Sequence, residues 1–306
     1  MKYQLSHLTR YQYQQPIANS YNLACLQPRT LPYQQVLHSG LQVTPTASSL
    51  YTHLDCFGNV RHFIHLQPPH QELSVLASSI VQVQPRRLAE QLSNGVSYET
   101  LQQFFVTPSA VALDGAIPST YQTFSTEALL AQQCRIASRM IPSMAETAAL
   151  WWQVQQPDRT VLENVAALTS LIFNEFNYDP EFSSVITPVS EVLAHKRGVC
   201  QDFAQLAISC LRTVGIPARY VSGYLETQPP EGLARLVGAD ASHAWFAVFD
   251  PTLGWVDFDP TNNVLPDERH LTLAYGRDYA DVVPLKGVLQ GLGEHLLEVA
   301  VDVMPL

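Results

Sequence analysis

Apolar and polar residues alternate along much of the first 84 residues, which is the pattern of half-buried β-strands. Short β-rich runs are separated by Pro, Gly and Asn, which favour turns. The runs that we expect to form strands are residues 11–13, 41–43, 60–66 and 79–83. The pattern changes near Pro85, so we predict a β-rich domain over residues 1–84 and a second domain over residues 85–306.

From about residue 126 the apolar residues recur at helical spacing. Thr160 and Glu163 form a capping box, which predicts a helix starting at residue 161. Thr187 followed by a proline predicts the start of a second, shorter helix, and Gly198 is expected to end it.

A third helix is predicted over residues 200–213, because its apolar residues form one stripe and Gly215 follows it. Beyond residue 218 the apolar period changes to two, which indicates strands. The predicted strands are residues 220–225, 244–249, 255–258 and a closing strand at 296–303. Helices followed by an antiparallel sheet give an α+β fold for the second domain.

Residues 250–254 have the composition of a hairpin turn. If Phe249 pairs with Trp255 across this turn, His243 and Asp259 lie on the same face of the sheet, one diagonal step apart. The two backbones would then be roughly 7–8 Å apart, within reach of their side chains. A slip of one residue in the register would put Asp259 on the opposite face.

Composition restricts the classes of partner. Apolar residues make up 46% of the 306 residues, which suits a globular protein with a substantial core. The formal net charge of −10 argues against nucleic acid or an anionic membrane as partner. No apolar run is long enough to span a membrane, and residues 1–7 lack the apolar core of a signal peptide. Five cysteines without a C-x-x-C spacing fit a reducing environment, so we expect a cytoplasmic protein.

Cys200 stands where the third helix begins, and this position suits a nucleophile. Free backbone N–H groups and the helix dipole favour a thiolate there, and Gly198 leaves the approach to the sulfur open. His243 could act as the base, and Asp259 could orient its ring and stabilise its positive charge, with Asp257 as the alternative carboxylate. This ordered trio predicts nucleophilic acyl transfer.

Four blocks of the second domain are RGVCQDF at 197–203, GIPARYVSGY at 215–224, SHAW at 242–245 and GWVDFDPT at 254–261. Together they resemble the core of bacterial transglutaminase-like proteins. The resemblance implies a papain-like core with Cys200 as nucleophile, His243 as base and Asp259 as orienting residue. Residues 55–59 with Pro69, His70 and Leu73 resemble the N-terminal region of the same group, and residues 276–284 resemble its C-terminal part.

We therefore expect cysteine-dependent hydrolysis or acyl transfer at amide bonds of a peptide or protein substrate, with no cofactor. The alternative is a catalytically silent module of the same fold that binds peptides or serves in assembly. His62 and His65 would point to opposite faces of a strand, so we expect no metal site there. Tyr178 is either a second oxyanion donor or a core tyrosine, and Asp202 is expected to cap its helix. The oligomeric state is not readable from the sequence.

Overall fold

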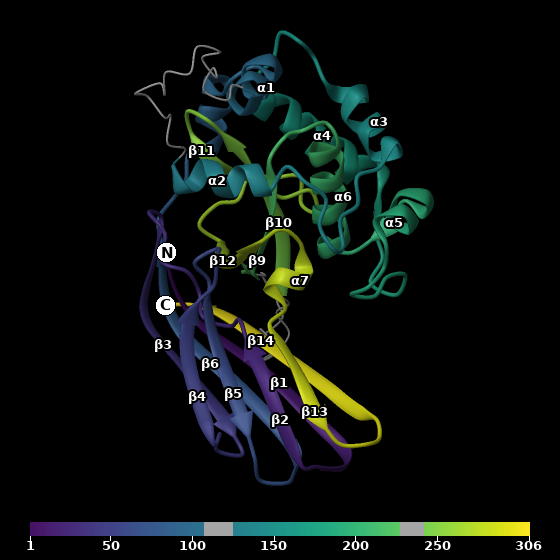
Figure 1. The fold of residues 1–306 in the computed structure, drawn as a ribbon. Coiled ribbons are helices and arrows are strands. Elements are labelled where there is room, and N and C mark those ends of the chain that lie inside the picture. Colours follow the sequence, from purple (N-terminus) through teal and green to yellow (C-terminus); the bar gives the residue numbers. More distant parts are fainter. Residues whose placement is uncertain (107–124, 227–241) are drawn as a thin grey trace, which may run out of the picture.

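The computed structural model describes residues 1–106, 125–226 and 242–306. Figure 1 shows a β-sandwich at one end of the molecule and a core of helices and strands at the other. The core combines helices with an antiparallel sheet, an α+β arrangement, as the sequence predicts.

The sandwich consists of two antiparallel four-stranded sheets whose apolar faces pack together. Its shared core includes Ile17 and Val75 from one sheet and Ile64 and Leu66 from the other. The first sheet has the order β14 (His295–Pro305), β1 (Lys2–Ile17), β6 (His70–Val83) and β3 (Gln34–Thr44). The second has the order β13 (Leu285–Gln290), β2 (Asn19–Ala24), β5 (Val60–Leu66) and β4 (Ser49–Leu54).

The C-terminal strands differ from the expected division of the chain. We assigned all residues after 84 to the second domain, but β13 pairs with β2 and β14 pairs with β1 along eleven residues. The last strands therefore complete the sandwich (Figure 1). We propose a division in which residues 1–84 and 285–306 form the sandwich and the residues between them form the core. Hydrophobic periodicity predicts that residues 296–303 form a strand, but it does not say which strand they pair with.

The core is built around an antiparallel sheet. Its strand order is β11 (Gly254–Phe258), β10 (Ser242–Asp250), β9 (Ala218–Leu225) and β12 (His270–Gly276). A short parallel pair joins β7 (Asn177–Tyr178) to β8 (Arg197–Gly198). The helices are η1 (Leu88–Asn94, a 3-10 helix), α1 (Tyr98–Val106), α2 (Thr126–Gln133), α3 (Ala145–Val154), α4 (Val161–Glu175), α5 (Val189–His195), α6 (Cys200–Thr213) and α7 (Tyr279–Val282).

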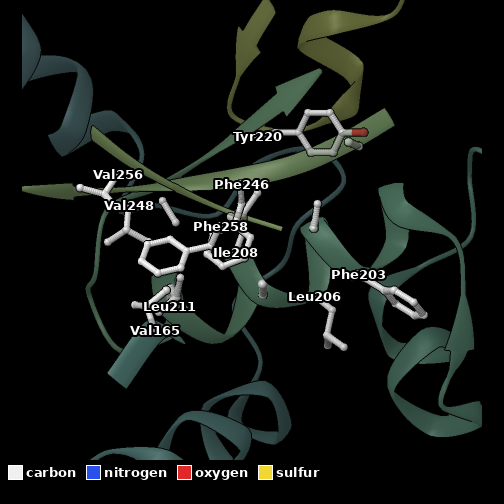
Figure 2. Close-up of a cluster of buried hydrophobic side chains, with 14 of the residues drawn as sticks. Val165, Phe203, Leu206, Ile208, Leu211, Tyr220, Phe246, Val248, Val256 and Phe258 are labelled. Carbon is white, nitrogen blue, oxygen red and sulfur yellow. The ribbon is translucent and has the colours of Figure 1, made fainter. Parts of the chain in front are cut away.

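Helix α6 packs across one face of this sheet (Figure 2). Leu206 and Leu211 of the helix are fully buried in the same cluster as Phe246 and Phe258 of the strands. Burying a side chain of this size contributes roughly 1.5–3 kcal/mol. The apolar stripe predicted from the sequence thus fixes the axis of α6 and, with it, the place of Cys200 at the helix N-terminus.

Side-chain amides of the sandwich hold the outer edge of the core sheet. β12 is the last strand of that sheet, and the amide of Gln34 donates to the backbone oxygen of Thr272 (2.7 Å) and accepts from its N–H (2.8 Å). Asn59 makes the same pair of bonds to the backbone of Tyr275, at 2.7 and 2.8 Å. These amides satisfy backbone groups that an edge strand leaves unpaired.

The structure confirms one helix prediction and corrects another. The capping box of Thr160 and Glu163 is confirmed at the start of α4. Helix α5 ends earlier than expected, because Lys196 adopts a left-handed conformation with φ of 50° and stops the helix before Gly198 is reached.

Strand β12 was not predicted, although its apolar residues alternate. Among the described residues, no helix is both long enough and apolar enough to cross a membrane.

Gly223 of β9 lies opposite His243 of β10, and the sheet requires a residue without a side chain there. A Cβ atom at this position would collide with the backbone oxygen of Leu271 and the ring of Trp245, both of which are fully buried. We expect Gly223→Ala to lower the free energy of unfolding by about 3 kcal/mol, measured by urea denaturation. Gly40→Ala is the matched control, since nothing lies within 4 Å of a Cβ there. Equal stability of the two variants would contradict this packing.

Candidate active site

Cys200 is the first residue of α6 and is half-buried. The carboxylate of Asp202 accepts a hydrogen bond from the backbone N–H of Val199 (2.8 Å), so its predicted capping role is confirmed. Burial raises the pKa of Asp202. A Cβ on Gly198 would lie 2.8 Å from the Cβ of Asp202, so glycine lets the chain turn closely into the helix.

Tyr178 lies beside the nucleophile position rather than in the core. The β7–β8 pairing sets it next to Gly198, two residues before Cys200, and its side chain is 59% exposed. Partial burial and then the negative charge of Cys200 raise the pKa of Tyr178, which indicates that the phenol and the sulfur are close. The interpretation of Tyr178 as a core tyrosine is therefore wrong.

The predicted hairpin register is confirmed. Phe249 pairs with Trp255, and the pairing continues as far as Phe246 with Phe258. His243 and Asp259 consequently lie on one face, and Nε2 of His243 is 2.8 Å from Oδ2 of Asp259. The side chain of Cys200 also hydrogen-bonds to His243. The three predicted residues thus form one continuous chain of contacts.

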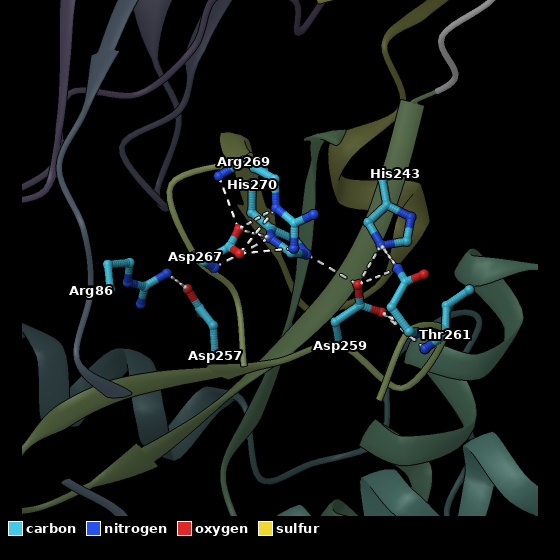
Figure 3. Close-up of polar contacts among 9 residues, drawn as sticks. Arg86, His243, Asp257, Asp259, Thr261, Asp267, Arg269 and His270 are labelled. Atoms are coloured by element: carbon cyan, nitrogen blue, oxygen red, sulfur yellow. Dashed lines mark hydrogen bonds and ion pairs between the residues drawn. The ribbon is translucent and has the colours of Figure 1, made fainter. Parts of the chain in front are cut away.

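Asp259 is fully buried, and its carboxylate accepts several hydrogen bonds (Figure 3). Its Oδ1 accepts from the backbone N–H groups of Thr261 (2.9 Å) and Asn262 (3.2 Å). Its Oδ2 accepts from the side-chain amide of Asn262 (2.7 Å) in addition to His243. Burial alone would favour the neutral acid, but the hydrogen bonds from His243 and His270 hold the pKa of Asp259 well below its usual range.

His270 is the residue of the site that the sequence analysis missed. It lies in β12, is 1% exposed, and its Nε2 is 3.1 Å from the same Oδ2 of Asp259. Its other nitrogen, Nδ1, is 3.2 Å from a carboxylate oxygen of Asp267 (Figure 3). The ring of Trp245 packs against both histidines, with centroid distances of 5.9 Å to His243 and 5.4 Å to His270. The alternating apolar residues of 270–276 are a signal that could have placed His270 on a strand of the sheet.

The electrostatics of His243 favour a charged ring. Burial by itself would lower the pKa of His243, but the hydrogen bonds with Asp259 and Cys200 outweigh it and raise the pKa to about 10. A protonated imidazole beside Cys200 stabilises a thiolate. The arrangement can therefore supply a nucleophile and a proton donor at neutral pH.

The alternative carboxylate, Asp257, faces another partner. Its side chain is 2.5 Å from the guanidinium of Arg86, and both groups are buried (Figure 3). The guanidinium of Arg86 also lies over the ring of Tyr33, 3.9 Å from its centroid. Asp257 is therefore committed to a buried ion pair and not to His243.

His243, Asp259 and His270 could in principle hold a metal, since one ligand atom from each lies within 4.8 Å of the others. The two nitrogen-to-oxygen distances of 2.8 and 3.1 Å are those of hydrogen bonds. The cluster is therefore described as a hydrogen-bonded network. We assign no metal to it.

Two family models and several known proteins match this chain. The family described as "Transglutaminase-like superfamily" matches residues 149–260, and the "Bacterial transglutaminase-like N-terminal region" matches residues 3–82. An uncharacterised protein of Mycobacterium tuberculosis is 35% identical over 309 residues, which cover 99% of this chain and 93% of that protein. The chain belongs to the transglutaminase-like superfamily. The resemblance inferred from the sequence blocks is thus confirmed.

Other transglutaminase-like relatives extend the comparison. A protein-glutamine gamma-glutamyltransferase of Pseudomonas aeruginosa is 34% identical over 110 residues, covering 33% of this chain and 16% of that protein. The crystal structure of a candidate cysteine protease from Cytophaga hutchinsonii has a TM-score of 0.69 at 21% identity, covering 99% of this chain and 90% of that one. The latter likeness shows that the whole transglutaminase-like fold, sandwich included, is shared.

The charged state of His243 can be measured directly. We expect its ring to lose its proton only near pH 10, followed by the NMR shifts of the imidazole. Because this pKa lies above the unfolded value of about 6.5, the ring contributes stability below about pH 6.5 that is lost as the pH rises toward 10. Asp259→Asn should move the midpoint roughly one to two pH units lower, since a charged hydrogen bond is removed. The exposed Asp158→Asn serves as control, and a wild-type midpoint near 6.5 would contradict the network.

Proposed function

We propose that this transglutaminase-like protein is an enzyme that hydrolyses or transfers acyl groups at amide bonds of a peptide or protein substrate. One observation carries the proposal: Cys200 begins a helix, contacts His243, and His243 is held by the buried Asp259. In this proposal the residues act as nucleophile, acid–base group and orienting carboxylate.

The first half of the reaction forms a thioester. The thiolate of Cys200 attacks the carbonyl carbon of the amide, and the oxygen becomes an oxyanion. The free N–H groups at the start of α6 are suited to stabilise that oxyanion, and the phenol of Tyr178 is the second donor that we propose. The carbon–nitrogen bond then breaks as His243 gives its proton to the leaving nitrogen.

The second half releases the acyl group. Water or an amine attacks the thioester, His243 accepts its proton, and the Cys200 sulfur leaves as a thiolate. We favour water, because an amine acceptor needs a second binding site and water does not. The relative named as a protein-glutamine gamma-glutamyltransferase makes transfer from glutamine side chains the alternative outcome of the same thioester.

His270 acts in this proposal as a positioning residue. It donates to the carboxylate oxygen that also holds His243, so it fixes that oxygen without touching the reacting atoms.

The chemistry also requires reduced sulfur. All five cysteines lie among the described residues and are free thiols, which supports a reducing compartment such as the cytoplasm.

Alkylation by iodoacetamide tests whether Cys200 is an activated nucleophile. We expect Cys200 to react rapidly at about pH 6 and to become roughly 100-fold slower in His243→Ala, because a thiol without an imidazolium is mostly protonated there. The exposed thiol of Cys56 in the same molecule is the internal reference, read separately by mass spectrometry. His62→Ala in the sandwich is the matched histidine control. If Cys200 and Cys56 react alike at every pH, the chain is a catalytically silent module.

The thioester itself is the second test. Wild-type protein incubated with cell extract and quenched in acid should carry an acyl adduct on the peptide that contains Cys200. Hydroxylamine should remove this adduct, because it cleaves thioesters and not thioethers. The Cys200→Ala variant should carry none. An adduct that resists hydroxylamine would argue against acyl transfer.

A further inference from the structure

A groove of about 720 Å³ lies where the sandwich meets the core, and neither wall of it belongs to the chain of contacts at Cys200. The sandwich contributes Tyr11 of β1 and Leu297 of β14, and the core contributes Val185, Ile186 and Tyr279. We call this feature the interdomain groove. Sites for ligands occur preferentially at such boundaries between domains.

The rim of the interdomain groove presents large apolar side chains to solvent. Ile186 is 79% exposed, Val185 is 55% exposed and Leu297 is 54% exposed. Side chains of this kind are normally shielded, and a cluster of them around a hollow marks a binding surface. The groove can therefore shield an apolar group of a ligand.

Two contacts lead from the groove to the nucleophile. On one side, the side-chain amide of Gln201, the residue after Cys200, donates to the backbone oxygen of Val185 (3.0 Å). On the other side, the ring of Tyr279 packs against that of Tyr220, with centroids 6.3 Å apart. Burial and then the charge of Cys200 raise the pKa of Tyr220, so this phenol lies near the sulfur. One residue on each side of the groove thus contacts a neighbour of Cys200, although Cys200 itself is not part of the lining.

The charge of the groove is opposite to that of the chain. The sequence has 27 acidic and 17 basic residues, yet the described lining of the groove contains Arg139 and Lys286 and no acidic residue. Arg139 is exposed and forms no ion pair with any described residue, and Lys286 donates only to the backbone oxygen of Ala280 (3.1 Å). A carboxylate on the ligand would complement these two cations.

We infer that the interdomain groove binds the segment of the protein substrate that flanks the reacting amide, and that this segment combines apolar side chains with a carboxylate. The inference rests on the proposed function, since it places the reacting amide at Cys200. An extended chain advances about 3.3 Å per residue, so three or four substrate residues beside the reacting amide would cover roughly 10–13 Å. The sandwich then serves to recruit substrate.

Peptides that carry an iodoacetyl group test this inference. The probes are the tripeptide amides Leu-Leu-Glu, Leu-Leu-Lys and Ser-Ser-Glu. Each is made in two orientations: in one the iodoacetyl group is attached to the amino terminus, and in the other it is attached to the side chain of a lysine added at the carboxyl terminus. Rates at Cys200 are divided by the rate with iodoacetamide. In at least one orientation we expect Leu-Leu-Glu to react about 10-fold faster than Ser-Ser-Glu and about 5-fold faster than Leu-Leu-Lys, as partly exposed contacts allow.

Charge reversal supplies the matched comparison. The double variant Arg139→Glu/Lys286→Glu should prefer Leu-Leu-Lys to Leu-Leu-Glu, and it should keep the wild-type rate with iodoacetamide. The control Lys2→Glu/Arg159→Glu changes the net charge equally at exposed positions outside the groove, and it should keep the wild-type preference. An unchanged preference in the groove variant would overturn the carboxylate part of the inference.

The outcomes separate the two proposals. Rapid reaction with iodoacetamide but equal rates for all peptides in both orientations would overturn the groove as the substrate site and leave the proposed function standing. Slow reaction of Cys200 with iodoacetamide, at the rate of Cys56, would overturn the proposed function and this inference with it.

Discussion

The buried carboxylate of Asp259 is the interaction on which the site depends. A charge removed from water is costly unless hydrogen bonds replace its hydration, and Asp259 receives them from two backbone N–H groups, an amide and two imidazoles. The same bonds fix the turn after β11, the start of β10 and the start of β12 in one geometry. They also raise the pKa of His243, so its ring stays charged beside Cys200.

The sandwich supports this site from a distance. Gln34 and Asn59 bind the backbone of β12 through their side-chain amides, and β12 carries His270, which holds Asp259. The sandwich also forms one wall of the interdomain groove. One domain therefore steadies the orienting carboxylate and, as we propose, receives the substrate.

Much of the site could be predicted because its signals are local. A turn of known length fixes the register of β10 and β11, and that register sets His243 beside Asp259. The end of α5 could not be predicted in the same way. The sequence predicts that Gly198 ends this helix, but the helix ends at Lys196, which adopts the left-handed conformation. Gly198 is a glycine for another reason, because a side chain there would collide with Asp202. A glycine signals an unusual backbone or a tight contact, and composition does not tell which.

Periodicity, caps and turn length act within about ten residues, so the sequence by itself determined α4, α6, the hairpin and the face that His243 and Asp259 share. The second histidine on Asp259 and the sheets that β13 and β14 join were decided only by the tertiary structure. His270 comes to Asp259 only through the pairing of β12 with β9, which no turn length sets, and β14 lies almost the whole chain away from β1. Strand edges and buried carboxylates accept any partner of suitable chemistry, and packing of the whole chain selects the one that is present.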